Sequence, residues 1–276
     1  TMMITGDAMA RPLIETLQED PNRWDLSSLF VTSSSAVVFS PSLKEAMLEL
    51  LPDIMVIDAI GSSESGMNGM VIQTKGQTAN HGGGGPTVKA GRDAVVLDDD
   101  LNPLPPGTGV IGKLARGGNI PIGYYKDPVK TAATFVHAPD GTRYVVAGDF
   151  ALHEEDGTIT LLGRGSVCIN SGGEKIFPEE VESVLKDHPE VYDVLVVGVP
   201  DDRWGQAVCA VVQPRHAAEP PTLADLDAHS RIHLAAYKTP RHLVIVDEIR
   251  RSPSGKPDYP WATALAQEAL AATTDA

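Results

Sequence analysis

Residues 162–182 read Leu-Gly-Arg-Gly-Ser-Val-Cys-Ile-Asn-Ser-Gly-Gly-Glu-Lys-Ile-Phe-Pro-Glu-Glu-Val-Glu, and this stretch divides the chain into two parts. An arginine between glycines is followed by a strand-like run at Val167–Asn170, a glycine pair and a helix that opens at Pro178. Glycine permits the unusual dihedral angles of a hinge or the close approach of a thin ligand, and proline suits the first turn of a helix. The pattern therefore predicts a domain boundary after Arg164.

The residues on the two sides of this boundary have different patterns. Before it, strand and helix signals alternate up to about residue 80, and short β runs separated by Gly and Pro follow from about residue 82. After it, a shorter alternation of strands and helices begins, in which Trp204 is predicted to be a packing residue at a strand entry. We expect an α/β and α+β protein. Residues 1–164 are predicted to be the end of a large domain, and residues 165–276 a small α+β domain.

The composition excludes several classes of protein. With 276 residues, 42% hydrophobic residues and a formal net charge of −15, the chain lacks the basic surface that nucleic acid or an anionic membrane requires. No apolar run has the length of a membrane span. Cys168 and Cys209 lack metal-ligand spacing and are predicted to be free thiols, which indicates a reducing, cytoplasmic location. The apolar, β-prone start at residues 1–6 predicts that the chain is a fragment of a longer protein.

Gly61-Ser62-Ser63-Glu64 directly follows a predicted strand at residues 54–57. In open α/β sheets ligands bind at the carboxyl ends of strands, where this turn exposes N–H groups and hydroxyls. A carboxylate beside phosphates requires a bridging Mg²⁺ ion. The alternative interpretation is a plain turn with a solvated glutamate.

Two further segments carry candidate side chains. Asp149 follows the apolar run at residues 144–146, where a carboxylate can accept both hydroxyls of a ribose, although a turn aspartate is the alternative. Lys256 ends an exposed Ser-Pro-Ser-Gly turn, from which it could neutralise charge that develops during adenylyl transfer. The alternative is a solvated loop lysine.

Taken in order, these segments resemble the signatures of the adenylate-forming superfamily, which includes acyl-CoA synthetases, firefly luciferase and peptide-synthetase adenylation domains. The matching segments are Ser-Ser-Ser-Ala at 33–36, Gly-Ser-Ser-Glu at 61–64, Gly-Asp at 148–149, Gly-Arg at 163–164 and Pro-Ser-Gly-Lys at 253–256. The sequence of residues 171–182 is most similar to FadD-type fatty-acid or steroid-acid CoA ligases. The resemblance covers almost the whole chain and implies the carboxyl-terminal portion of such an enzyme.

The resemblance also implies site residues. It implies Lys256 and Glu64 as catalytic residues, with Glu64 as the Mg²⁺ ligand. The residues implied to bind the nucleotide or coenzyme A are Ser35, Ala36, Asp58, Ala59 and Ile60 around the adenine, Gly61, Ser62 and Ser63 at the phosphate, Asp149 and Arg164 at the ribose, and Gly172, Gly173 and Glu174 at the pantetheine channel. In this family the small domain rotates between the two half-reactions, so that the resemblance implies Lys256 for the first and the Gly172–Gly173 segment for the second.

The implied reaction uses ATP, Mg²⁺ and coenzyme A to convert a small carboxylic acid, by way of an acyl-adenylate, into an acyl-CoA. The acyl substrate is left open between fatty and steroid side-chain acids, and so is a homo-oligomeric state. No nucleic acid and no integral membrane segment are expected. The alternatives are a ligase that loads a carrier protein, such as a peptide-synthetase adenylation enzyme, and a noncatalytic nucleotide-binding or interaction module.

This sequence departs from the family pattern in three places. Ile60 stands where the family usually has tyrosine, and Ser166 replaces the usual hinge residue, which leaves the anchoring of the rotation open. The Ser/Thr/Gly-rich phosphate loop of the family is absent from the 276 residues. We therefore expect this chain on its own not to form an adenylate.

Overall fold

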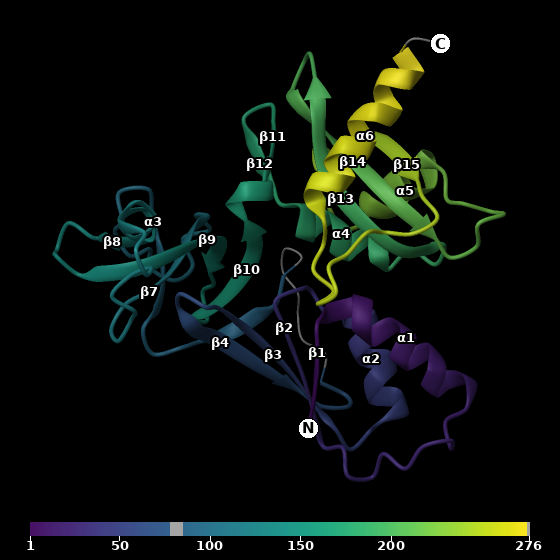
Figure 1. Cartoon of the computed structure of the whole chain (residues 1–276), viewed down its shortest axis with the longest axis horizontal. Helices are drawn as coiled ribbons and strands as arrows, with labels where there is room; N and C mark the ends of the chain where they lie inside the picture. The colour runs from purple at the N-terminus through teal and green to yellow at the C-terminus, as the bar shows by residue number, and fades with distance from the viewer. Residues whose placement is uncertain (78–84, 275–276) are drawn as a thin grey trace. The chain divides into compact units, whose positions relative to one another are not determined.

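The computed structural model describes residues 1–77 and 85–274. It divides into two compact units, Thr1–Arg164 and Gly165–Ala276 (Figure 1). The start of the β-rich region, expected from about residue 82, lies partly outside the described residues.

The large unit is built on one ten-stranded mixed sheet with the strand order β1-β2-β3-β4-β5-β10-β9-β7-β6, in which β8 also pairs with β9. The strands β1, β2 and β3 run parallel, and the remaining neighbours are antiparallel. The strands are β1 (Met2–Ile4), β2 (Val31–Ser35), β3 (Met55–Ser62), β4 (Gly66–Gln73), β5 (Thr87–Ala90), β6 (Ala94–Leu97), β7 (Gly112–Arg116), β8 (Phe135–His137), β9 (Arg143–His153) and β10 (Thr158–Arg164). The helices are α1 (Gly6–Glu19), α2 (Pro41–Leu50) and α3 (Pro128–Thr134).

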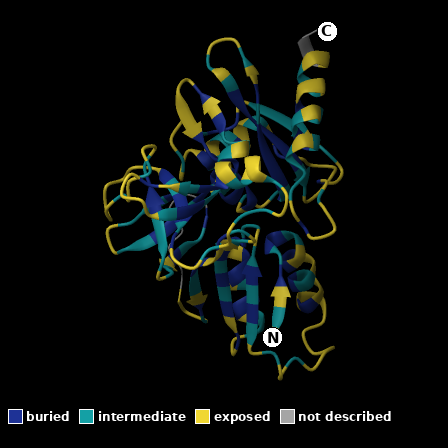
Figure 2. Cartoon of the chain, turned by 60° about the vertical axis from the view of Figure 1, so that its left-hand side comes forward, coloured by how far each residue is buried: buried dark blue, intermediate teal, exposed yellow. Residues whose placement is uncertain are grey.

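Among the described residues, the two largest of three hydrophobic clusters hold most of this sheet together. The first joins α1 and α2 to the parallel strands through Ala10, Ile14, Met47 and Val56, which are all buried. The second fills the β-rich part and includes Ile60, Val88, Val96, Leu114 and Ile159. Figure 2 shows buried residues along these strands and on the inner sides of both helices. The expected α/β region followed by a β-rich region is confirmed.

The small unit has a five-stranded sheet with the order β12-β11-β14-β13, and β15 pairs in parallel with β14. Its elements are β11 (Ile169–Ser171), β12 (Glu174–Ile176), α4 (Pro178–Lys186), β13 (Val191–Asp201), β14 (Gly205–Pro214), α5 (Leu223–Ser230), β15 (His242–Ile245) and α6 (Tyr259–Thr274). Residues Gly165–Val167 form a turn of 3-10 helix, so the strand predicted from Val167 begins only at Ile169.

The long hairpin β13–β14 is buried on both faces. Val194 and Val196 belong to a cluster with α4 and α5, whereas Leu195 and Val197 belong to a cluster with α6. This explains the uninterrupted apolar run of residues 194–197, because a strand covered on both sides needs no polar alternation. Among the described residues, no helix is both long enough and apolar enough to cross a membrane.

A buried ion pair ties α2 to β3. The side chains of Lys44 and Asp58 pair while only 3% and 7% exposed. Their partnership satisfies two charges that would otherwise be costly to bury. The carboxyl-terminal end of β3 and the turn that follows it, residues 58–64, are therefore fixed to α2.

We expect Lys44→Met to reduce the free energy of unfolding by about 3–5 kcal/mol, because it leaves Asp58 buried without its cation. Adding Asp58→Leu should restore most of that loss. Urea denaturation followed by circular dichroism measures both. The control is Lys75→Met, since Lys75 forms a 2.8 Å pair with Glu49 while 44% and 69% exposed, and its loss should cost less than about 1 kcal/mol. Equal losses at the two lysines would contradict this account.

Candidate functional site

The carboxyl ends of β2 and β3 lie side by side in the large unit. Because these strands are parallel, Ser35 is aligned with Ala59. Ala36, the next residue, is exposed and has a φ of 74°, a left-handed conformation that alanine rarely adopts. The chain thus turns sharply where the adenine is expected.

The strand β3 directs alternate side chains to opposite faces. Val56, Asp58 and Ile60 are buried on one face, and Ala59 is only partly buried on the other. Burial raises the pKa of Asp58, and the positive charge of Lys44 opposes this rise. The Asp58 carboxylate is thus occupied by Lys44, and any contact of residue 58 with a ligand would come from its backbone.

The turn between β3 and β4 is held by hydroxyl groups. The Ser65 hydroxyl lies 3.0 Å from the Ser62 hydroxyl, which accepts the Ser65 N–H at 3.0 Å. A Cβ at Gly61 would meet the Gly66 carbonyl at 2.2 Å, so this position requires glycine. Arg116 of β7 donates to the Ser65 carbonyl at 2.8 Å. The turn is therefore rigid.

This turn presents an exposed Ser63 and a half-buried Glu64. The Tyr124 hydroxyl donates a 2.5 Å hydrogen bond to Oε1 of Glu64. The Lys130 ammonium lies 4.0 Å from the centre of the Tyr124 ring. The hydrogen bond from Tyr124 lowers the pKa of Glu64, and the charge of Lys130 acts in the same direction.

Tyr124 was not identified from the sequence. The sequence does show a helix start at Asp127-Pro128 shortly after Gly123-Tyr124, and this pattern could have drawn attention to Tyr124. Asp127 caps α3, and the Thr131 hydroxyl accepts the Tyr124 N–H at 2.9 Å. A Cβ at Gly123 would meet Thr131 at 2.4 Å, so the segment is tightly packed.

The residues present fit a magnesium ion that arrives with a nucleotide. In the described part of the chain, no three side chains of His, Cys, Asp or Glu gather as a metal cage. A single ionised carboxylate, with Oε1 of Glu64 held by Tyr124, suits Mg²⁺, which is commonly bound by one or two carboxylates together with substrate phosphates and water.

Asp149 and Arg164 lie opposite each other on β9 and β10. Arg164 Nε donates to Oδ1 of Asp149 at 3.3 Å, and the aspartate is the more buried of the two. Burial raises the pKa of Asp149, Arg164 opposes this effect, and the negative charge of Glu64 adds to it. The large unit thus brings Asp149, Arg164 and Glu64 into one electrostatic environment.

The glycine pair of the small unit forms the two-residue turn of the β11–β12 hairpin. Gly172 and Gly173 have φ values of 60° and 89°, as a type I′ turn requires. Gly172 N–H donates to the Trp204 carbonyl at 2.8 Å, and a Cβ at Gly172 would lie 2.8 Å from the Trp204 ring. Trp204 therefore packs directly against this turn, and Glu174 after it is exposed.

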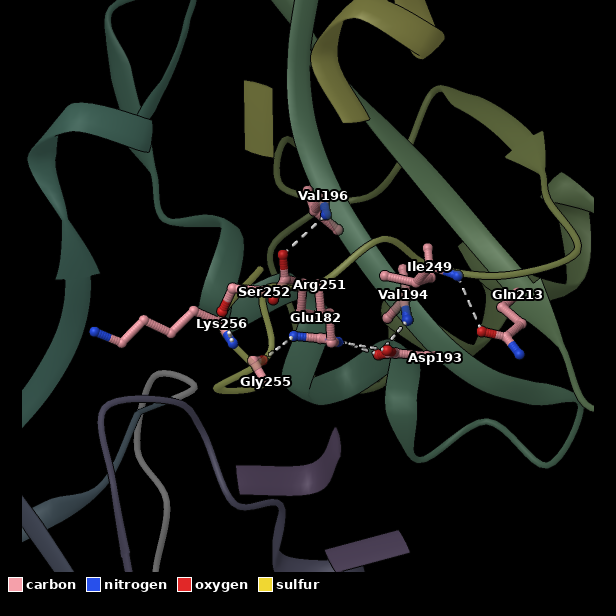
Figure 3. Close-up of polar contacts among 10 residues, drawn as sticks. All are labelled: Glu182, Asp193, Val194, Val196, Gln213, Ile249, Arg251, Ser252, Gly255 and Lys256. Carbon is pink, nitrogen blue, oxygen red and sulfur yellow. Dashed lines mark hydrogen bonds and ion pairs between the residues drawn. The ribbon is translucent and has the colours of Figure 1, made fainter. Parts of the chain in front are cut away.

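Lys256 lies at the end of an exposed loop in the small unit (Figure 3). Its N–H donates to the Ser252 hydroxyl at 3.1 Å, and its carbonyl accepts the Ser252 N–H at 2.9 Å. The side chain extends away from the other residues drawn. The expected site residues thus fall on two units, with Lys256 and the glycine turn on the small one.

Comparisons with known proteins give one family. Residues 180–256 match the model of the AMP-binding enzyme C-terminal domain. The chain is 56% identical over 270 residues to a medium/long-chain-fatty-acid–CoA/3-oxocholest-4-en-26-oate–CoA ligase of Mycolicibacterium smegmatis, covering 97% of this chain and 48% of that protein. It is 30% identical to a medium-chain fatty-acid–CoA ligase of Escherichia coli, covering 93% of this chain and 44% of that protein.

Two solved structures have a fold similar to that of this chain. The amide bond synthetase McbA of Marinactinospora thermotolerans aligns with a TM-score of 0.77 and 28% identity over 96% of this chain and 52% of its own. ATP-bound MatB of Rhodopseudomonas palustris, at 23% identity, has the same fold with a TM-score of 0.75, over 98% of this chain and 52% of its own. The chain spans about half the length of the curated relatives it matches. The resemblance to adenylate-forming enzymes is confirmed.

We expect Gly172→Ala to destabilise the chain more than Gly173→Ala. Both changes place alanine at a positive φ, which costs about 1–2 kcal/mol. Only Gly172→Ala also drives a Cβ into Trp204, because nothing lies within 4 Å of a Cβ at Gly173, and such overpacking costs about 1–3 kcal/mol more. Urea denaturation together with tryptophan fluorescence checks this, and equal effects of the two changes would refute the proposed packing.

We expect Tyr124→Phe to raise the pKa of Glu64 towards the ordinary value of a glutamate, because it removes the hydrogen bond that lowers this pKa. A depressed pKa in the folded state stabilises the fold above the ordinary pKa, about 4.3, and this contribution is lost as the pH falls through the folded value. Carbon-13 NMR of the Glu64 carboxylate measures the change. Tyr125→Phe is the control, since Tyr125 is 87% exposed.

Proposed function

This chain carries an AMP-binding enzyme C-terminal domain and corresponds to the carboxyl-terminal part of adenylate-forming enzymes, and on that basis we propose that it serves an ATP-dependent acyl-CoA synthetase. The reaction converts a carboxylic acid into an acyl-adenylate and then into an acyl-CoA. The chain would supply the ribose, metal and lysine groups of that site.

The observation that carries the proposal is the neighbourhood of Glu64 and Asp149. Burial raises the pKa of Asp149 and the negative charge of Glu64 adds to this effect, so the two carboxylates lie close enough to act on one another. A nucleotide with its magnesium ion accounts for both carboxylates. Asp149 would accept the two ribose hydroxyls, and Glu64 would face the phosphates through the cation.

Each half-reaction uses a different surface of the small unit in this proposal. In the first, Lys256 would stabilise the negative charge that develops between the carboxylate substrate and the α-phosphate. In the second, the Gly172–Gly173 turn would guide the thiol of coenzyme A, since glycines allow a thin ligand to pass close to the backbone. The bound Mg²⁺ would supply positive charge at the phosphates. Arg164 would hold Asp149 in place.

The substrate we propose is a fatty acid or a steroid side-chain acid. Two relatives at 56% identity, one of them from Rhodococcus rhodochrous, are named as 3-oxocholest-4-en-26-oate–CoA ligases. A carrier-protein ligase is the alternative enzyme, and a noncatalytic nucleotide-binding module is the alternative from another class. A cytoplasmic location belongs to the same proposal. It is supported by the free thiols of Cys168 and Cys209, the latter with its pKa raised to about 12 by burial.

A chimera tests this function. The chain would replace the matching half of the Mycolicibacterium smegmatis ligase, and pyrophosphate release and acyl-CoA formation would be assayed with fatty and steroid acids. We expect activity that requires coenzyme A. Lys256→Ala should slow acid-dependent pyrophosphate release by about 100- to 1000-fold, because it removes charge stabilisation in the first half-reaction.

The same Lys256→Ala chimera should form acyl-CoA from a synthetic acyl-adenylate within a few-fold of the unmodified rate. Lys75→Ala in the large unit is the matched control and should leave both half-reactions unchanged. A chimera that binds AMP but forms neither adenylate nor thioester would favour the noncatalytic alternative.

A further inference from the structure

The loop that carries Lys256 is closed on itself. Besides the two hydrogen bonds between Ser252 and Lys256, Gly255 N–H donates to the Ser252 carbonyl at 2.8 Å, and Gly255 has a φ of 78°. Arg251 and Pro257, which flank the loop, form an antiparallel bridge. The base of the lysine is therefore a small, well-defined turn, which still needs an anchor to the rest of the unit.

One arginine provides that anchor (Figure 3). Arg251 donates from Nε and Nη2 to the two carboxylate oxygens of Asp193, each at 2.8 Å. Its third nitrogen, Nη1, donates to the carbonyl of Gly255 at 3.2 Å. A single planar guanidinium thus links β13 to the residue before Lys256, with fixed geometry that a lysine could not reproduce.

This link is buried among further charges. The side chains of Arg251 and Asp193 are 10% and 15% exposed. Glu182 of α4 accepts the Val196 N–H at 2.9 Å, and its charge acts on Arg251. Lys186, also buried, acts on Asp193. Such a network is costly to rearrange, because each member would leave another charge unpaired.

The same network reaches α6. Burial raises the pKa of the Tyr259 hydroxyl on α6, and the negative charges of Glu182 and Glu179 add to this effect. Burial alone would raise the pKa of Asp193, but the hydrogen bonds from Arg251 and the charges of Lys186 and Arg251 together outweigh it and hold that pKa below its ordinary value. Three elements, α4, β13 and α6, therefore contribute to the anchoring of one loop.

The preceding residue offers a natural comparison. Arg250 lies 3.3 Å from Asp258, and its side chain is 67% exposed. Arg250 carries the same charge one position earlier. Among the described contacts, its guanidinium makes no bidentate pair with a carboxylate and no hydrogen bond to the loop. Any effect of charge alone would be shared by the two arginines, whereas an effect of anchoring would belong to Arg251.

We infer that Arg251, clamped by Asp193, is a positioning residue that fixes the direction in which Lys256 enters the adenylation site. The effect on adenylation rests on the proposed function, whereas the anchoring of the loop by Arg251 does not depend on it. Lysine has a long flexible side chain, so restraint of its backbone narrows the positions of the ammonium group. A misplacement of about 1 Å can cost a factor of about 100 in rate.

The first experiment uses the 276-residue chain itself. Amide hydrogen exchange of Gly255 and Lys256 would be measured by NMR in the unmodified chain, Arg251→Lys, Arg251→Gln and Arg250→Gln. We expect both Arg251 changes to speed exchange at these two amides by about tenfold or more, since local opening governs exchange. The β13–β14 amides should keep their protection, and Arg250→Gln should change nothing.

Arg251→Lys keeps the charge and so guards against a variant that simply fails to fold. Unchanged exchange at Gly255 and Lys256 in this folded variant would overturn the inference. So would an equal acceleration in Arg250→Gln.

The second experiment uses the chimera. Arg251→Lys should slow acid-dependent pyrophosphate release by about 10- to 100-fold, while acyl-CoA formation from synthetic acyl-adenylate stays within twofold. A merely structural role would slow both half-reactions equally and would overturn the positioning role. Asp193→Asn should have the same selective effect, and the double variant should be no slower than the single ones.

If the unmodified chimera proves inactive, the proposed function fails, while the exchange experiment still decides whether Arg251 anchors the loop.

Discussion

Burying a charge in a protein is costly unless an opposite charge or hydrogen-bond partners are fixed beside it, and both units of this chain bury such an ion pair next to their candidate site segments. Lys44 and Asp58 join a helix to the strand that leads into Glu64. Arg251 and Asp193 join a strand to the loop of Lys256. Because breaking such a pair strands a charge in the interior, each pair holds its exposed neighbour in one place. The candidate residues Glu64 and Lys256 can then remain partly or fully exposed.

A second consequence concerns Glu64. Its turn is held by hydroxyl contacts, and Arg116 of β7 and Tyr124 of the segment between β7 and α3 both reach it. The hydrogen bond from Tyr124 holds one oxygen of the Glu64 carboxylate, and it thereby also sets the direction in which the other oxygen points. In the proposed function, this arrangement would prepare Glu64 for a nucleotide-bound cation before the cation arrives, which would reduce the entropy lost on binding.

The sequence predicted the turn that carries Glu64, because this turn directly follows a strand. Asp149 was expected at the end of a strand, but β9 continues past it to His153 and its side chain is largely buried there. The contact of Tyr124 with Glu64 was not predicted, because sixty residues separate the two and they meet through the segment between β7 and α3. The partner of Asp58 was likewise hidden, although the alternation of β3 places it with buried Val56 and Ile60. Arg250 and Arg251 look equivalent in the sequence, and only the position of Asp193 distinguishes them.

The hairpin at Gly172 and Gly173 has a consequence for how the gene can vary. Every one-base change in a glycine codon that alters the amino acid adds a side chain, and at Gly172 any side chain meets the ring of Trp204. At Gly173 a side chain would strain the left-handed backbone but would meet no neighbouring atom within 4 Å. Packing therefore constrains two adjacent codons for the same amino acid to different degrees. The indole ring, rather than the backbone alone, sets that difference.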